Sequence, residues 1–178
     1  MIRTFDSLDR FTVGTVGMPG ERTFYIQFRA SNTLLSFSLE KSQVAVLSER
    51  LRHMVKEIKA TNPLLAHIEK SKDSLPLDTP IEDEFRVGSM AIFFDSDSEK
   101  IQLDLRELNQ NSDEEEDDDL FEDGDVEVVR LFVTIGQALT FSARSELILG
   151  AGRAQCPFCG FPINPTGHIC ARANGYRR

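Results

Sequence analysis

The chain has no tryptophan, no cysteine before residue 156 and no apolar run of membrane-spanning length. The lack of such a run argues against a transmembrane helix. A signal peptide would need a basic start followed by an apolar stretch, and the first residues show no such stretch. Three cysteines, all near one end, exclude a disulfide framework through the body and suit a reducing compartment. We therefore expect a cytosolic protein with no membrane partner. At 178 residues it has one ordinary domain or two small halves.

Basic residues are missing from residues 109–125, which hold ten of the 29 acidic residues. The rest of the chain has 19 acidic and 20 basic residues, so the net charge of −9 comes from this insertion. Residues 113–119 are seven consecutive acids, which repel one another and cannot pack. They predict a solvated loop that aids solubility. A cation site or a nucleic-acid mimic is the alternative, and no ligand spacing supports it.

The cysteines lie in the segment QCPFCGFPINPTGHICARANGYRR, residues 155–178, as two close pairs: Cys156-x-x-Cys159 and His168-x-Cys170. Two such pairs joined by a short loop supply the four donors of a tetrahedral zinc ion. Gly160 permits the positive φ angle that lets the chain double back after the second thiolate. The spacing thus predicts a Cys3His zinc knuckle. Four protein ligands leave no open coordination position, so we expect the zinc to be structural.

A Cys-Pro-Phe-Cys sequence is also typical of thioredoxin-like redox proteins, where it follows a strand and opens a helix. Here the motif follows a predicted helix, and the remaining residues are too few for the rest of such a fold. A third cysteine and a histidine lie close by. The sequence therefore favours zinc binding over redox chemistry.

Two short patterns occur twice in the body. FTVGT at 11–15 resembles FRVGS at 85–89, and the pattern QVxxLSxR from Gln43 resembles QAxxFSxR from Gln137. The offsets are 74 and 94 residues, and their difference is close to the length of the acidic insertion. We predict two β-β-β-α units at 1–62 and 85–150, the second carrying the insertion at 109–125. Residues 63–84 would be a linker with one helical turn, and residues 151–178 the zinc-binding tail.

Local signals agree with this division. The residues Met18-Pro19-Gly20-Glu21 suit a type II turn, and Thr134 and Gln137 suit a capping box at a helix start. We expect helices at about 40–61 and 134–150 and strands at 11–16, 23–30, 33–39, 87–95, 100–105 and 126–133. Together they predict an α+β two-layer fold, with one or two antiparallel sheets, two packed helices and the C-terminal knuckle.

The blocks DRFTVGTVGMPGERTFYIQFRA, LEKSQV, FRVG and CPFCGFPINPTGHICARANGYRR resemble an uncharacterised bacterial family known only as domain of unknown function 3090. The resemblance spans essentially the whole chain and is weakest at 63–84 and in the acidic run. It implies the organisation and the zinc tail, but no reaction.

The tail is rich in arginine: from Arg144 onward there are five arginines, no lysine and a single acid. Arginine binds phosphate or carboxylate groups in bidentate fashion, and a zinc knuckle is a rigid support for it. The tail therefore offers a candidate surface for a polyanion such as nucleic acid, or for a protein partner. Pairing with the acidic insertion is the alternative. The candidate residues are Arg153, Arg172, Tyr176, Arg177 and Arg178.

No catalytic residue can be assigned from the sequence, because no nucleophile–base pair, paired carboxylates or nucleotide-binding fingerprint is present. We therefore favour a non-enzymatic, zinc-stabilised binding or adaptor protein. The alternative is an enzyme acting on a phosphorylated substrate in a cleft between the two units, near Gly14 and Gly88. A deep pocket lined by polar groups with shifted pKa values would favour the enzyme.

Overall fold

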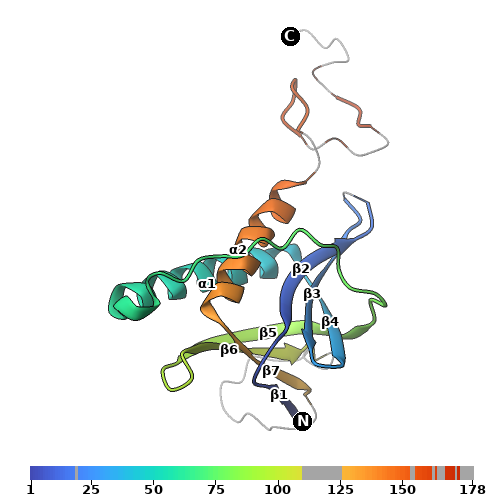
Figure 1. Cartoon of the computed structure of the whole chain (residues 1–178). Coiled ribbons are helices and arrows are strands. Elements are labelled where there is room, and N and C mark those ends of the chain that lie inside the picture. The colour runs from blue at the N-terminus through green and yellow to red at the C-terminus, as the bar shows by residue number, and fades with distance from the viewer. Residues whose placement is uncertain are drawn as a thin grey trace, which may run out of the picture.

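The computed structural model describes residues 1–18, 20–109, 126–152, 155–161, 163, 167–170 and 172. Strand β1 comes first and is followed by the order β-β-β-α twice (Figure 1). The elements are β1 (Ile2–Phe5), β2 (Arg10–Val16), β3 (Thr23–Ala30), β4 (Thr33–Leu39), α1 (Lys41–Thr61), the 3₁₀ turn η1 (Pro63–Leu65), β5 (Asp83–Asp95), β6 (Lys100–Glu107), β7 (Val128–Val133) and α2 (Ile135–Gly150).

All seven strands form one sheet in the order β1-β7-β6-β5-β4-β3-β2. The expectation of a purely antiparallel sheet is wrong, because β1 pairs with β7 and β4 pairs with β5 in parallel. The β4–β5 connection includes α1 and residues 62–82, and a long crossover of this kind returns the chain in the same direction. The mixed sheet joins the two β-β-β-α segments edge to edge, while their origin by duplication remains a prediction.

Both helices begin and end where their sequences favour it. In α1, Glu40 and Gln43 form a capping box, and Asn62 before Pro63 ends the helix. In α2, the predicted capping box is confirmed, since Thr134 accepts a hydrogen bond from Gln137 N–H and Gln137 accepts one from Thr134 N–H. The hairpin turn between β2 and β3 is also confirmed by a hydrogen bond from Glu21 N to Met18 O, with Gly20 at φ 104°. Pro19 lies outside the described residues.

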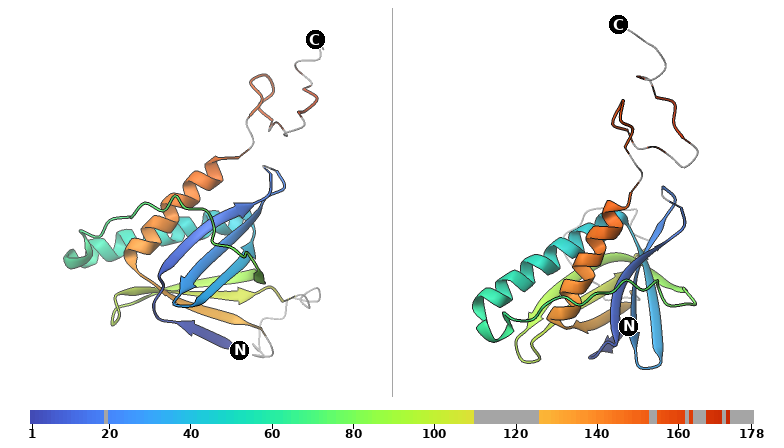
Figure 2. Two further views of the ribbon diagram at one scale, coloured as in Figure 1. Left: turned by 45° about the vertical axis from the view of Figure 1, so that its right-hand side comes forward. Right: turned by 45° about the horizontal axis from the view of Figure 1, so that its top comes forward.

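The two helices pack against one side of the curved sheet and against each other (Figure 2). Successive side chains of a strand point to opposite faces of the sheet. In β2 and β4, four consecutive residues are nevertheless buried, residues 11–14 and 36–39. Val13 on β2, Ile26 on β3 and Leu103 on β6 have no exposed surface, and Phe141 of α2 stacks on Phe11 with ring centroids 4.6 Å apart. One hydrophobic core thus lies between the sheet and the helix pair, which confirms the α+β class.

Residues 63–82 cross over α2 toward β2 before entering β5 (Figure 1). The expected single helical turn is η1. The acidic insertion lies outside the described residues apart from Asn109. Within the part of the chain that is described, no helix is long and apolar enough to cross a membrane.

Candidate metal centre

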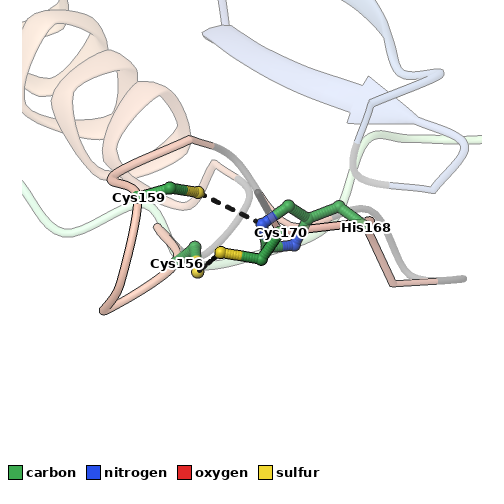
Figure 3. A group of neighbouring side chains, drawn as sticks. All are labelled: Cys156, Cys159, His168 and Cys170. Carbon is green, nitrogen blue, oxygen red and sulfur yellow. Dashed lines mark hydrogen bonds between the residues drawn. The ribbon is translucent and has the colours of Figure 1, made fainter. Parts of the chain in front are cut away.

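The four predicted ligands converge in the tail that follows α2. The donor atoms of Cys156, Cys159, His168 and Cys170 all lie within 4.8 Å of one another. The Sγ atoms of Cys156 and Cys170 are 3.8 Å apart, and Cys159 Sγ lies 3.3 Å from His168 Nε2 (Figure 3). Cys156 and Cys170 are buried although the segment is short. The four side chains could therefore hold one metal ion.

The backbone turns so that the first two thiols face the same point. Gly160 N donates a hydrogen bond to Cys156 O, and Cys156 N donates one to Phe161 O, both at 2.8 Å. Gly160 has a φ of 75° and Gly167 a φ of 86°, values that residues with a side chain rarely adopt. The expected role of Gly160 in doubling back the chain is therefore confirmed. We call residues 155–172 the knuckle.

The backbone around the first cysteine also prepares its thiol for a metal. A hydrogen bond from the backbone N–H of Cys159 is the main cause that lowers the pKa of Cys156 to about 7. At Cys159 a hydrogen bond from Phe161 N–H acts in the same direction, but burial and the neighbouring thiols of Cys156 and Cys170 raise its pKa overall. Near neutral pH one thiolate is thus available to a cation, whose charge then favours deprotonation of the others.

The predicted arginine surface is described at one position only. Arg172 is exposed, and its Nη1 donates a hydrogen bond to Phe158 O at 3.2 Å, which ties the end of the knuckle to its first turn. Arg153, Tyr176, Arg177 and Arg178 lie outside the described residues. The surface of the knuckle also carries apolar side chains that the sequence reasoning did not single out: Phe158 is 62% exposed, Phe161 70% and Ile169 88%.

The two glycines near the alternative cleft have different surroundings. A Cβ atom on Gly14 would lie 2.4 Å from Leu77 Cγ, so this glycine is covered by the segment 63–82. Gly88 instead lines a hollow of about 280 Å³ between α1 and β5, in which Arg50 is the only charged residue among the described lining residues. The structure thus covers Gly14 and leaves Gly88 beside an open hollow.

A partly buried ion cluster holds the segment that covers Gly14, and sequence reasoning missed it. Arg10 donates two hydrogen bonds to the Asp73 carboxylate, at 2.9 and 3.1 Å, and Arg144 Nη1 donates to Asp73 O at 2.8 Å. Burial would raise the pKa of Asp73, but the hydrogen bonds from Arg10 and the charges of Arg10 and Arg144 hold it below its ordinary value. A lone aspartate in a segment without periodicity gave no signal for this role.

Comparison with curated proteins and with solved structures finds no match. A family profile described as "Protein of unknown function (DUF3090)" matches residues 3–170, which include all four candidate metal ligands and, apart from Ile2 at the start of β1, every helix and strand given above. The resemblance found in the sequence is therefore confirmed, and the chain belongs to the DUF3090 family.

Proposed function

We propose that the chain is a zinc-stabilised binding protein without catalytic chemistry, whose knuckle is held by a structural Zn²⁺ ion and contacts a partner protein. The convergence of three thiols and one imidazole carries this proposal. Thiolate and imidazole donors in a Cys3His set are typical of zinc, and hard cations such as Ca²⁺ or Mg²⁺ prefer oxygen ligands.

The spacing of the donors suits zinc. With Zn–S bonds of about 2.3 Å and tetrahedral angles, two sulfur ligands lie about 3.8 Å apart, and a sulfur and a nitrogen ligand about 3.6 Å apart. The corresponding distances are 3.8 Å for Cys156–Cys170 and 3.3 Å for Cys159–His168. Four protein donors fill the coordination sphere and leave no place for a water or a substrate. This arrangement supports a structural ion rather than a Lewis acid.

The exposed apolar side chains support a binding role for the knuckle. Phe158, Phe161 and Ile169 project from a segment too short to bury them, and such side chains on a rigid support favour contact with another protein. Arg172 fixes the turn that carries Phe158. The arginines outside the described residues would add charge to the same surface.

The test compares partner recovery by full-length variants from cell extract. The double variant Phe158→Ser/Phe161→Ser should lose a protein partner that the wild type retains, while keeping its zinc and its circular dichroism. Phe93→Ser is the matched control, because Phe93 is a similarly exposed phenylalanine on β5, outside the knuckle.

Equal recovery by the wild type and the double variant would contradict the proposal. Recovery of RNA instead of protein would favour the polyanion. In that case the quadruple variant of Arg153, Arg172, Arg177 and Arg178 to alanine should lose it, and the wild-type affinity should fall steeply with salt.

A further inference from the structure

Helices α1 and α2 meet through positions that are 94 residues apart, which is also the offset of their matching sequences. Ser48 Oγ donates to Ser142 O at 3.3 Å, and Ser142 Oγ donates to Ser48 O at 3.2 Å. Arg52 pairs with Glu146, again 94 residues apart. Reciprocal contacts of this kind are what an approximate twofold relation between the two helices produces. Positions 94 apart thus occupy corresponding places on α1 and α2.

The outer side of α2 is occupied by an extended segment of the same chain, residues 70–78. Ser71 N donates to Thr140 Oγ at 2.9 Å, Arg144 binds Asp73, and Leu77 lies on Gly14 of β2. The residues of α2 that line the space beneath this segment are Thr140, Ala143, Arg144, Leu147 and Ile148. An acidic side chain and a leucine four residues later thus anchor an extended peptide beside α2.

The corresponding positions of α1 line an open groove. The residues 94 positions before those of α2 are Val46, Glu49, Arg50, His53 and Met54, and together with Glu57 and Ile92 of β5 they line a hollow of about 420 Å³. The smaller hollow at Gly88 shares Val46, Arg50 and Ile92 with it, so the two adjoin. Gly88 itself corresponds to Gly14 by the 74-residue offset. We call the two hollows together the α1 groove; all of its described lining residues belong to α1 and β5.

The neighbouring strand leaves the α1 groove accessible. β4 pairs with β5 only at Asp83 and Arg86, so beyond this point the edge of β5 faces α1. Gln43 of α1 donates to Val87 O and Gly88 O, at 3.1 and 3.0 Å. These hydrogen bonds close the end of the groove nearest Gly88, which we call its inner end. Val46 is 47% exposed above this floor. The side of Gly88 where a Cβ would project is covered by the backbone of Leu108, whose Cα would lie 2.7 Å from that atom. An extended chain could thus lie along β5 with an apolar side chain against Val46.

The charged residues that line the α1 groove indicate which peptide sequences it would bind. Arg50 forms no hydrogen bond or ion pair with any described residue, whereas the corresponding Arg144 binds Asp73. The inner end thus combines an unpaired guanidinium with the apolar side chains of Val46, Met90 and Ile92. Glu49 and Glu57 also line the larger hollow, where they would repel a second acid and accept a basic residue. Residues 70–77, which lie beside α2, have a matching charge pattern, with Lys70 and Lys72 before Asp73 and Leu77.

We propose that the α1 groove binds an extended peptide segment of a partner protein, in which an aspartate or glutamate meets Arg50 and an aliphatic side chain packs against Val46, Met90 and Ile92. The binding mode would resemble that of residues 70–78 on α2. This site is independent of the knuckle and of its metal.

The test selects binders from a display library of random twelve-residue peptides with the zinc-loaded full chain. Enriched peptides should carry an acidic residue and a large aliphatic residue a few positions apart. A fluorescently labelled enriched peptide should bind Arg50→Glu and Val46→Asp about tenfold or more weakly than the wild type. Lys56→Glu is the matched control, since it makes the same charge change on the exposed side of α1 outside the groove and should leave affinity within about twofold.

Thermal melting of the variants shows whether they fold, and both altered side chains are exposed enough to be replaced without loss of the core. Failure to enrich any peptide, or equal affinity of the wild type and both groove variants, would overturn the proposal. A concentration-dependent dimer that Arg50→Glu abolishes would place a second copy in the groove. Peptide binding seen only after deletion of residues 111–123 would place the chain's own acidic segment there. A dimer of this kind, or binding only after the deletion, would also overturn the proposal of a partner peptide.

Discussion

The four proposed metal ligands should contribute differently to zinc affinity. Cys156→Ser or Cys170→Ser should lose the zinc, because each removes a buried thiolate that a hydroxyl cannot replace. His168→Ala should weaken binding less, because water can take the place of the imidazole. Native mass spectrometry of the full chain measures the stoichiometry. Stoichiometric zinc in both cysteine variants would show that the assignment is wrong.

Metal binding by the same residues depends on pH. Zinc must displace the proton of every thiol, and a pKa of about 7 for Cys156 means that acidification below neutral pH protonates this thiol. Zinc affinity should therefore fall steadily from pH 7.5 to pH 5.5, as measured by competition with a chromogenic chelator whose own pH dependence is known. A constant affinity across this range would show that thiolates do not supply the ligands.

Asp73 should control the stability of the body. Asp73→Ala should lower the free energy of unfolding by about 2 kcal/mol, since it removes the carboxylate that Arg10 and Arg144 share and leaves Arg10 only its pairing with Asp78. The pKa of Asp73 is lowered in the folded state, so its contribution is present at neutral pH and is lost as the pH falls below about 4. Urea unfolding at pH 7 and at pH 3 measures both effects. Asp73→Asn serves as the control, because it should lack the acid-dependent part.

At the scale of elements, the segment 70–78 is part of the packed body rather than a passive linker. Gly14→Ala should destabilise the fold by about 1–3 kcal/mol, because the added Cβ would overlap Leu77. In a Leu77→Ala background the same substitution should cost little, since the overlapping atoms are gone. A double-mutant cycle measures this coupling, and equal costs in the two backgrounds would show that the segment does not lie on Gly14.

Most elements of the fold could be predicted because their signals are local. Val44, Leu47, Leu51, Val55 and Ile58 recur at helical spacing, and all five are buried on α1. The metal ligands were equally readable, since Cys156, Cys159, His168 and Cys170 are close in sequence and their spacing alone limits the chemistry.

The parts that were missed depend on contacts between distant residues. Strand β1 has only four residues and forms by pairing Ile2 with Val128, which no local pattern indicates. The parallel pairing of β4 with β5 depends on the path of the crossover rather than on either strand's sequence. The roles of Asp73 and Leu77 likewise arise from contacts with Arg10, Arg144 and Gly14.

At the scale of the whole molecule, the acidic insertion should be dispensable for folding. A chain lacking residues 111–123 should keep its free energy of unfolding within about 0.5 kcal/mol, because seven adjacent like charges cannot contribute to a core. Urea unfolding of the two chains at low and high salt measures this. A large loss that added salt reduces would indicate specific ion pairs between the insertion and the body.

The proposed structural metal should matter for the knuckle but not for the rest of the molecule. A ligand set filled by protein donors holds the knuckle in one shape and offers the metal to no substrate. The two proposed binding surfaces are then separate: the knuckle carries Phe158 and Phe161, and the α1 groove carries Arg50. Loss of zinc should impair the first surface and leave the second intact.

X-ray absorption at the zinc edge of the purified full chain tests the structural metal centre most directly. We predict a four-coordinate ion with three sulfur neighbours at about 2.3 Å and one nitrogen at about 2.0 Å, contributed by Cys156, Cys159, Cys170 and His168. A coordination shell that contains a water oxygen, or fewer than three sulfurs, would contradict a closed structural site and would support a catalytic metal instead.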